Sequence, residues 1–327
     1  MTDPLRLGVL GANSFVARAA IYPAVAASNE IEIVAIASNS KIPAELSDKA
    51  RGSYQAVLED PAVEAVYIPL PNHLHRRWTE RAAASGKHVL CEKPLATAPD
   101  DVAAMYAACR SAGVVLAEAF MTPFHPRTTA VVDEVRSGSI GEVRSIRTEF
   151  SFTISPEHSD NYRWVQDHGG GALWDVGIYT LSPIFDLLDN PTVRAVTSNI
   201  GPSGVDVTTA VMLTTDDATA TALCSFEMPE RQLLEIRGTA GTITFDRAYT
   251  PSEDDDHYLI HRPDRSRDRV VTGGADPYRL MLEAFAKTCR GQPEWPRSEA
   301  DTLAMIGQIT ELISISGPRP TPARTSR

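Results

Sequence analysis

Residues 5–16 read Leu-Arg-Leu-Gly-Val-Leu-Gly-Ala-Asn-Ser-Phe-Val, and an alanine-rich stretch follows to about residue 27. An apolar run, a glycine turn and a helix-forming stretch, in this order, are typical of the start of a dinucleotide-binding fold. At such a turn the backbone amides of the helix N-terminus approach a pyrophosphate. Gly11 fits the first glycine of the motif, whereas Asn13, which tolerates left-handed backbone angles, and Val16 replace the second and third. By itself this degraded motif also fits an ordinary strand, turn and helix.

The first part of the chain alternates between apolar, β-branched runs and helix-forming stretches. We expect helices at residues 73–85, 100–112 and 126–137, and further strands at residues 31–37, 65–68, 88–91 and 114–117. This alternation predicts a parallel sheet that is covered by helices on both faces. The helix at 126–137 is expected to lead the chain out of this domain.

The second part is dominated by strands and turns. Residues 143–153 alternate between polar and apolar side chains, and turns rich in Gly, Pro and Asp separate further strand candidates at residues 193–200, 207–214, 219–228, 233–237 and 242–245. Strands joined by turns predict a mostly antiparallel sheet. Helices are expected at residues 172–188, 277–289 and 298–315, and a frayed tail at 317–327. The predicted fold class is therefore an α/β Rossmann-type domain with a parallel sheet, residues 1–122, followed by an α+β domain with a large, mostly antiparallel open sheet, residues 123–327.

The composition argues against several classes of partner and location. The 327 residues, of which 43% are hydrophobic, fit two domains. The net charge of -11 disfavours nucleic acid as a partner. No apolar run is long enough to span a membrane, and the N-terminus lacks the basic and apolar regions of a signal peptide. The four cysteines are not spaced for metal binding or redox chemistry, so we expect a cytoplasmic protein with reduced thiols.

The end of the strand expected at residues 31–37 indicates which dinucleotide binds. An acidic residue there would accept hydrogen bonds from the ribose 2′-hydroxyl of NAD. This chain instead has Ser38, Asn39, Ser40 and Lys41, without a carboxylate that would repel a 2′-phosphate. Ser38, Asn39 and Lys41 could bind that phosphate, and a solvated loop is the alternative. The sequence therefore favours NADP over NAD.

Two further segments have a composition typical of ligand sites. Glu92-Lys93-Pro94 follows the strand expected at 88–91, and charged residues just beyond the carboxyl end of a parallel strand lie where open α/β sheets bind ligands. The second segment reads Gly-Gly-Gly-Ala-Leu-Trp-Asp-Val-Gly-Ile-Tyr over residues 169–179. Its first three glycines permit close backbone approach. Asp175 and Tyr179, four residues apart, share one face of a helix.

Taken together, these motifs resemble the glucose-fructose oxidoreductase, inositol dehydrogenase and rhizopine-catabolism (Gfo/Idh/MocA) superfamily. The matching motifs follow the family order along nearly the whole chain: Gly11 after the first strand, Ile68-Pro69-Leu70-Pro71-Asn72-His73-Leu74-His75, Glu92-Lys93-Pro94, Glu118-Ala119-Phe120-Met121, and the glycine-rich stretch with Asp175 and Tyr179. The resemblance implies a nicotinamide-dependent oxidoreductase. Asn13 in place of the second glycine is the main departure from the family pattern.

The resemblance also implies roles for individual residues. Lys93 and Tyr179 would be catalytic, with Asp175 supporting them. Tyr rather than His at position 179 is similar to the branch that holds xylose and dihydrodiol dehydrogenases and the 3-ketoreductases of nucleotide-linked deoxysugars, which commonly uses NADP. The chemistry agrees, because a phenol can donate a proton to a ketone oxygen. A nearby ammonium is expected to lower the phenol pKa from about 10 and to stabilise an alkoxide.

The other site residues are expected around this centre. Cofactor contacts are expected from Gly11, Asn13, Ser14, Phe15, Ser38, Asn39, Lys41, Leu70, Pro71, Asn72, His75, Glu92, Lys93, Arg163 and Trp164. Substrate contacts are expected from Lys93, Met121, His125, Asp175 and Tyr179. Asn72 could also cap a helix, His125 could simply begin one, and Arg163 with Trp164 could be a structural cation-aromatic pair. Because His73 and His75 lack a third ligand nearby, we expect no metal site.

Four functions remain open at this point. They are a sugar or polyol dehydrogenase, a reductase of a nucleotide-linked keto-sugar, a glycosidase that oxidises its substrate transiently, and a non-catalytic dinucleotide sensor. Lys93 and Tyr179 argue against the sensor, and glycosidase relatives usually carry His rather than Tyr. The exact substrate and the direction of the reaction stay open. One sheet face of the second domain would be exposed in a monomer, and relatives pair through it, so we expect a homodimer or a homotetramer.

Overall fold

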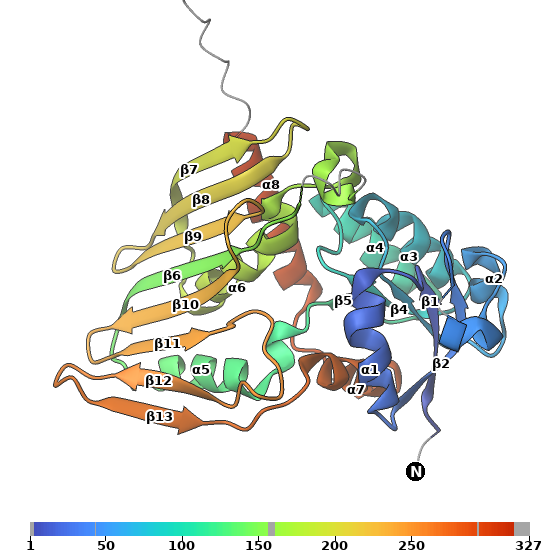
Figure 1. Ribbon diagram of the computed structural model, residues 1–327, viewed down its shortest axis with the longest axis horizontal. Coiled ribbons are helices and arrows are strands. Elements are labelled where there is room, and N and C mark those ends of the chain that lie inside the picture. The colour runs from blue at the N-terminus through green and yellow to red at the C-terminus, as the bar shows by residue number, and fades with distance from the viewer. Residues whose placement is uncertain (1–2, 43, 156–160, 293, 317–327) are drawn as a thin grey trace, which may run out of the picture.

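The computed structural model describes residues 3–42, 44–155, 161–292 and 294–316, and it contains two sheets with helices packed against them (Figure 1). The first sheet is parallel, with the strand order β2-β1-β3-β4-β5. All residues of the short strands β3 and β5 are buried, as expected where helices cover both faces. The strands of this sheet are β1 (Leu5–Leu10), β2 (Ile31–Ala37), β3 (Ala65–Ile68), β4 (His88–Glu92) and β5 (Leu116–Ala119).

The helices of the first sheet vary in length, and several are short 3-10 or π-helical turns. They are η1 (Ala17–Ile21), which is π-helical and continues as α1 (Tyr22–Ala26), and then η2 (Ala44–Lys49), α2 (Tyr54–Glu59), η3 (Asn72–Leu74), α3 (His75–Ala84), α4 (Pro99–Ala112) and η4 (Thr122–Phe124). The sequence did not predict η2 and α2, which are only six residues long each. The strand expected at 114–117 starts at Leu116, because Gly113 ends α4 with a φ of 69° and the next two residues lead into the strand.

A helix from the far end of the chain also packs on the first sheet. α7 (Pro277–Cys289) lies beside α1 and contacts β2 (Figure 1). Ser28 Oγ donates a hydrogen bond to Glu283 Oε1 at 3.1 Å, and Arg290, directly after α7, pairs with Glu30 at 3.1 Å. The apolar pattern of residues 277–289 predicts a helix but not the sheet that it covers. The domain boundary at residue 122 therefore stays a prediction, with α7 as a link back to the first domain.

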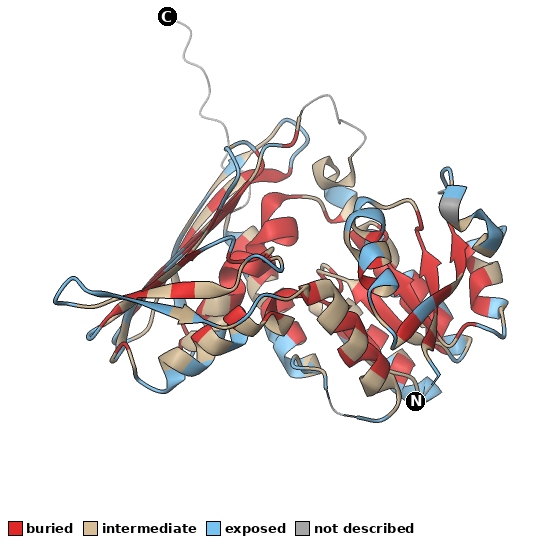
Figure 2. Ribbon diagram, turned by 60° about the horizontal axis from the view of Figure 1, so that its bottom comes forward, coloured by how far each residue is buried: buried red, intermediate tan, exposed pale blue. Residues whose placement is uncertain are grey.

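The second sheet has eight strands in the described residues, in the order β13-β12-β11-β10-β6-β9-β8-β7, and only the β6–β9 pair is parallel. One face is covered by α5 (Pro126–Arg136), α6 (Ile178–Leu187) and α8 (Glu299–Ser316), and buried residues concentrate under these helices (Figure 2). The predicted fold class is confirmed. The strands are β6 (Val143–Ser151), β7 (Thr192–Ile200), β8 (Asp206–Thr214), β9 (Thr219–Ser225), β10 (Arg231–Gly238), β11 (Thr242–Asp246), β12 (His257–His261) and β13 (Arg267–Val271).

The hairpin of β12 and β13 was missed by the sequence analysis. β12 buries Tyr258 and Ile260, but β13 reads Arg-Asp-Arg-Val-Val and is mostly exposed. An edge strand needs only one paired side and no buried face, so its side chains carry little of the alternation that predicts a strand. The tail expected at 317–327 lies outside the described residues.

One contact between the second sheet and a helix fixes the start of the segment that carries Asp175 and Tyr179. This segment begins with a π-helical turn, η7 (Leu173–Gly177), and continues as α6. Asp206, the first residue of β8, accepts hydrogen bonds from the Leu173 amide and the Thr209 hydroxyl, both at 2.9 Å. Gly171 has a φ of 115°, and a Cβ there would collide with Asp206 Oδ1. The glycine therefore allows the carboxylate to reach the helix terminus.

The burial of Asp206 leads to a prediction about stability. Burial raises the pKa of Asp206 to about 6, above the value of about 3.9 for an unfolded chain. A carboxyl group whose pKa is raised by folding stabilises the folded state below the unfolded pKa, and this contribution is lost as the pH rises through 6. We expect Asp206→Asn, which keeps an acceptor for the Leu173 amide, to gain unfolding temperature relative to the wild type from pH 4 to pH 7. Thermal unfolding across this range tests the pKa, and a difference between the two proteins that is independent of pH contradicts it.

Candidate active site

Two loops at the carboxyl ends of β3 and β4 are held together by one buried histidine. The ring of His75 is fully buried, with Nε2 2.7 Å from the Leu70 carbonyl oxygen and Nδ1 3.0 Å from the Pro94 carbonyl oxygen. Burial lowers the pKa of His75. The Lys93–Pro94 peptide bond, in the second of these loops, is cis. His75 thus positions the two loops, and its expected contact with a cofactor stays a prediction.

Lys93, Asp175 and Arg163 form a buried ion cluster between the two domains. Lys93 Nζ donates to Asp175 Oδ1 at 3.0 Å and to the Asp175 carbonyl oxygen at 2.8 Å. Arg163 Nε donates to Asp175 Oδ2 at 2.6 Å, and its Nη2 donates to Oδ1 at 3.2 Å. Burial disfavours the charged form of each of these three groups, but their attraction to one another favours the charged forms more strongly. The pKa of Asp175 is therefore lowered, and the pKa values of Lys93 and Arg163 are raised.

Tyr179 lies one helical turn after Asp175, and its ring faces this cluster. Lys93 Nζ is 4.9 Å from the centroid of the Tyr179 ring. The ring packs against Phe120 and Phe150, with centroids 5.1 Å and 5.5 Å away. The phenol hydroxyl points to Met121 Sδ at 3.8 Å, so two of the residues expected at the substrate meet here.

The electrostatic environment of Tyr179 differs from the one expected from the sequence. Burial raises the pKa of the Tyr179 phenol well above its ordinary value, and the carboxylates of Glu92 and Asp175 act in the same direction. The pKa of Tyr179 is thus raised and not lowered as expected, because burial outweighs the effect of the nearby cations. The phenol is therefore protonated throughout the neutral pH range.

Three tyrosines that the sequence analysis did not assign surround the same cluster. Tyr67, in β3, donates to Glu92 Oε1 at 2.6 Å. The guanidinium carbon of Arg163 is 5.0 Å from the centroid of the Tyr162 ring. Burial raises the pKa of Tyr278, at the start of α7, and the neighbouring Tyr179 adds to this effect. Tyr162 could have been found from its place beside Arg163, whereas nothing in the sequence around Tyr278 connects α7 with the site.

The turn after β1 fits the pyrophosphate of a dinucleotide. Gly11 has a φ of 108°, and a Cβ there would lie 2.9 Å from Leu70 Cδ2 and 3.2 Å from the Pro69 carbonyl oxygen. Ser14 Oγ accepts a hydrogen bond from the Ala17 amide at 3.2 Å, and Phe15 is 86% exposed. A bare glycine turn at the start of a helix is what close approach of a pyrophosphate requires. The residues present therefore fit this group.

The loop after β2 contributes uncharged hydroxyl groups next to this turn. Asn13 Nδ2 donates to Ser40 Oγ at 3.1 Å, and the hydroxyls of Ser38 and Ser40 are 3.0 Å apart. Arg18, on η1, donates to Asn13 Oδ1 at 3.2 Å. The structure thus adds Ser40 and Arg18 to the group expected from the sequence. The remaining members of that group, Asn39 and Lys41, are exposed on the same loop.

Asn72 joins the two domains instead of capping a helix. Its Nδ2 donates to the Gly169 carbonyl oxygen at 2.9 Å. A Cβ at Gly169 would lie 2.9 Å from the Asn72 Cβ, which explains a glycine at this position. The residues before η3 and α3 are Pro71 and Leu74, and neither has a capping side chain. The capping interpretation of Asn72 is therefore wrong.

His125 and Trp164 lie in structural positions. His125 is fully buried and begins α5, with Nδ1 accepting from the Arg127 amide at 3.1 Å and Nε2 3.2 Å from the Ser252 carbonyl oxygen. This supports the helix-start interpretation of His125, and its substrate contact stays a prediction. Trp164 packs edge-on against Phe226, with centroids 5.8 Å apart. The sequence suggested that Arg163 and Trp164 could form a structural cation-aromatic pair. Arg163 stacks on Tyr162 instead.

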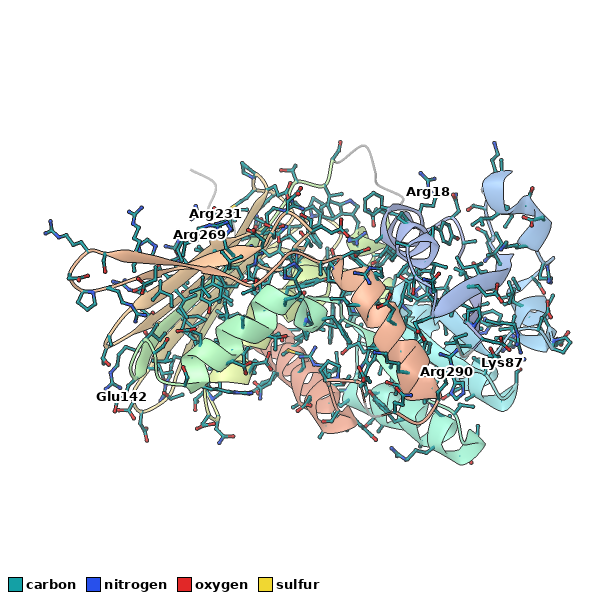
Figure 3. The ribbon with its side chains drawn as sticks, turned by 90° about the horizontal axis from the view of Figure 1, so that it is seen from below. Arg18, Lys87, Glu142, Arg231, Arg269 and Arg290 are labelled. Atoms are coloured by element: carbon teal, nitrogen blue, oxygen red, sulfur yellow. The ribbon has the colours of Figure 1, made fainter. Side chains whose placement is uncertain are left out.

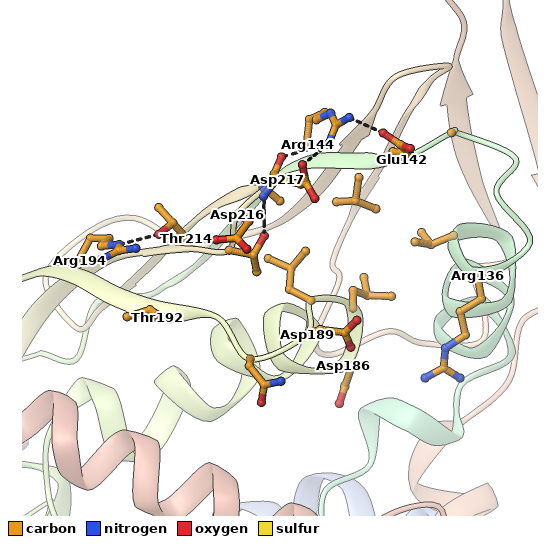
Figure 4. A pocket seen from close by; sticks show the side chains of 18 residues that line it. Arg136, Glu142, Arg144, Asp186, Asp189, Thr192, Arg194, Thr214, Asp216 and Asp217 are labelled. Carbon is orange, nitrogen blue, oxygen red and sulfur yellow. Dashed lines mark hydrogen bonds and ion pairs between the residues drawn. The ribbon is translucent and has the colours of Figure 1, made fainter.

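A hollow of about 860 Å³ lies between the ends of α5 and α6, the strands β6, β7 and β8, and the turn after β8 (Figure 4). Its rim carries Arg144, which pairs with Glu142 and Asp217, and Arg194, which donates to Thr214. Lys93, Asp175 and Tyr179 do not line it, and we assign it no role. In the described ranges, no group of His, Cys, Asp and Glu side chains could hold a metal ion. Nor does this part of the chain contain a helix with the length and apolar character needed to cross a membrane.

Known proteins match both domains. Residues 5–120 match the oxidoreductase family with an NAD-binding Rossmann fold, and residues 128–244 match the GFO/IDH/MocA C-terminal domain. The chain is 40% identical to D-xylose 1-dehydrogenase (NADP(+)) 2 of Haloferax volcanii, over 94% of this chain and 96% of that protein. It is 37% identical to dTDP-3,4-didehydro-2,6-dideoxy-alpha-D-glucose 3-reductase of Streptomyces violaceoruber, over 93% of this chain and 92% of that protein.

A solved structure shares the arrangement of both sheets. The crystal structure of a 3-ketoreductase from Actinomadura kijaniata, in complex with NADP and TDP-benzene, matches with a TM-score of 0.88 and 30% sequence identity, covering 96% of this chain and 98% of that chain. The two family models and these relatives span the glycine turn, the Lys93 loop and the Tyr179 helix. The chain therefore belongs to the Gfo/Idh/MocA family of oxidoreductases.

Proposed function

We propose that this protein transfers a hydride between NADP and a carbinol or ketone carbon of a sugar or sugar derivative. The observation that carries the proposal is the placement of a neutral phenol, Tyr179, against a charged ammonium, Lys93, at the carboxyl edge of the parallel sheet. Ligands of open α/β sheets bind at this edge. The turn at Gly11 follows β1 at the same edge, so the residues that would hold a dinucleotide and the Lys93 loop share this edge of the sheet.

Tyr179 is the proposed proton donor in the direction of reduction. A bound nicotinamide would supply the hydride to carbon. The O–H bond of Tyr179 breaks as its proton passes to the former carbonyl oxygen. The tyrosinate then regains a proton from solvent. Because burial raises the pKa of Tyr179, the donor is protonated through neutral pH. Oxidation in the reverse direction needs the tyrosinate and is therefore favoured by alkaline pH.

Lys93 is the proposed charge that stabilises the substrate oxygen. Its ammonium has three N–H donors, and two of them are taken by the side-chain and main-chain oxygens of Asp175. Among the described residues the third has no hydrogen-bond acceptor, so it can point toward a substrate oxygen beside Tyr179. Arg163 holds Asp175 from the other side, so the carboxylate cannot turn away from Lys93. Asp175 is therefore an orienting group.

NADP is the cofactor that fits the loop after β2. Ser38 and Ser40 offer hydroxyl groups, and Arg18 offers a cation, where a carboxylate would repel the 2′-phosphate. The prediction of NADP is confirmed by relatives, since the Haloferax volcanii enzyme is named for NADP(+) and the Actinomadura kijaniata structure contains NADP. The predicted contacts of individual residues with NADP stay part of this proposal.

The substrate proposal has two forms, because the relatives are named for two kinds of sugar substrate. One is a free sugar, as in D-xylose 1-dehydrogenase, and the other is a nucleotide-linked keto-deoxysugar, as in the dTDP-sugar 3-reductase. A screen for NADPH oxidation and NADP reduction against both kinds separates them. Net redox change without bond cleavage sets both apart from a glycosidase, and any turnover sets them apart from a dinucleotide sensor.

Self-association through the open face of the second sheet is also part of the proposal. Arg231 and Arg269 lie on the side of the sheet away from α5 and α8 (Figure 3). The same face carries Glu149, which pairs with Arg231, and Met212, which is 43% exposed. A face with both charge signs around apolar side chains can pair with a second copy across a twofold axis. We propose a homodimer or homotetramer in the cytoplasm, where the four cysteines, all free, stay reduced.

Replacing the phenol hydroxyl tests the proton donor. Tyr179→Phe keeps the ring that packs on Phe120 and Phe150, so folding and NADP binding should survive. The loss of a general acid should slow turnover by about 10²–10⁴-fold. In the wild type, reduction should be independent of pH in the neutral range, because the raised pKa keeps Tyr179 protonated. Single-turnover hydride transfer from bound NADPH measures both. Tyr258→Phe, on β12 and bonded to Glu134, is the control. Near-native rates for Tyr179→Phe assign the proton to another group.

Introducing a carboxylate at the end of β2 tests cofactor choice. The wild type should bind NADP more tightly than NAD, and Ser38→Asp should reverse this order because the new charge repels a 2′-phosphate and accepts bonds from a ribose hydroxyl. Each tenfold change in preference corresponds to about 1.4 kcal/mol. Fluorescence titration with both dinucleotides measures the ratio, and Ser137→Asp, after α5, serves as the control. A wild type that prefers NAD contradicts the proposal.

A charge placed on the open sheet face tests the assembly. Met212→Glu should convert the oligomer to monomers, because Met212 is flanked by Ala195 and Thr221 in the sheet and would lie inside the proposed interface. Light scattering at micromolar concentration measures the mass. Ile315→Glu, on α8, changes an exposed apolar residue elsewhere and should leave the oligomer intact. A monomeric wild type rejects the proposed interface.

A further inference from the structure

Glu118, in β5, is a buried carboxylate that the proposed catalytic cluster does not include. It is 2% exposed. Its Oε1 accepts a hydrogen bond from the Leu95 amide at 2.9 Å. Because Leu95 follows directly on Lys93 and Pro94, this bond anchors the loop that presents the Lys93 ammonium. A carboxylate buried in this way requires a countercharge.

Arg297, in the segment before α8, supplies that countercharge. Its Nη1 is 3.8 Å from Glu118 Oε2, and its side chain is only 10% exposed. The guanidinium carbon of Arg297 lies 4.7 Å from the centroid of the Phe120 ring. The Phe120 ring also packs against the Tyr179 ring, with the two centroids 5.1 Å apart. A single aromatic side chain thus links Arg297 to the proposed proton donor.

The other arm of the same guanidinium reaches the helix that carries Tyr179. Arg297 Nη2 donates to Ser182 Oγ at 3.3 Å, and Ser182 in turn donates to Asp186 Oδ2 at 3.0 Å. Ser182 is 4% exposed and lies three residues after Tyr179 in α6, which is about one helical turn. Arg297 therefore contacts both the strand that anchors the Lys93 loop and the helix that carries Tyr179.

We infer that Arg297 is a positioning residue that fixes the Lys93 ammonium and the Tyr179 hydroxyl relative to each other. A guanidinium suits this role, because it is planar, always charged, stacks on aromatic rings and donates in several directions. It touches neither of the two proposed catalytic groups directly. A misplacement of about 1 Å can slow an enzymatic step by about 10²-fold. This inference rests on the proposed function for its kinetic readout, but the contacts of Arg297 can also be tested without turnover.

Arg297→Met tests the inference by keeping the length and the apolar contact while removing the charge. We expect single-turnover hydride transfer to slow by about tenfold or more, within the range for misplaced groups, with the NADP dissociation constant and the KM of the substrate changed less than twofold. Arg297→Lys, which keeps the charge beside Glu118, should recover part of the rate. The control is Arg110→Met, which removes an exposed arginine that pairs with Glu299 at the start of α8. It should leave the rate unchanged.

Ser182→Ala provides a second, milder test that removes only the arm toward α6. We expect a smaller loss of rate than for Arg297→Met. The double variant should be no slower than Arg297→Met alone, because both substitutions remove the same hydrogen bond between Arg297 and Ser182. Additive losses, a native rate for folded Arg297→Met, or a loss confined to KM each overturn the inference.

Hydrogen exchange keeps the inference apart from the proposed function. Arg297→Met should speed amide exchange in residues 178–187 and 93–96 relative to the wild type, with residues 54–59 in α2 unchanged as the internal control. If the wild type turns over no sugar substrate, the proposed function fails while this exchange result still decides the role of Arg297. Unchanged exchange in both segments rejects it.

Discussion

The carboxylate of Asp175 is buried between two domains, and its charge must be balanced there. Lys93 reaches it from the loop after β4, and Arg163 reaches it from the loop before η7. Removing either cation would leave a buried charge that is only half compensated, which costs far more than an exposed ion pair contributes. Arg163 and Asp175 belong to the same domain, so the pair of Lys93 with Asp175 is the contact of this cluster that ties the two domains together.

Several other polar side chains help to hold the two domains in this arrangement, because they form hydrogen bonds with backbone groups. His75 joins the loops after β3 and β4, Asn72 holds Gly169 against the first domain, and Asp206 fixes the first turn before α6. Such side chains satisfy backbone groups that loops would otherwise bury without partners. The ends of the segments that carry Lys93 and Tyr179 are thus fixed by hydrogen bonds, while the apolar core fixes their middles.

The sequence predicted features whose cause is local. Runs such as 5–10 and 31–37 are mostly apolar, each with a single charged residue, so they indicated buried parallel strands. The apolar period of 277–289 gave the bounds of α7. Motif spacing likewise singled out Lys93, Asp175 and Tyr179. The features that were missed depend on contacts between distant segments. Tyr278 comes to the site only because α7 returns to the first domain, and the exposed hairpin of β12 and β13 has no local pattern. The direction of the Tyr179 pKa shift was also missed, because it depends on how deeply the ring is buried and on the carboxylates of Glu92 and Asp175 that lie near it.

The return of α7 has a consequence for how the chain is made. On the ribosome, residues 1–122 emerge first, but the face beside α1 and β2 is covered by α7, whose Met281, Leu282 and Phe285 are buried in the finished protein. At synthesis rates of roughly 5–20 residues per second, that face waits for roughly 10–30 s after residue 122 has been added. During this interval the apolar surface that α7 later covers has no partner from the chain, so the first domain can reach its final packing only after the C-terminal part has been made.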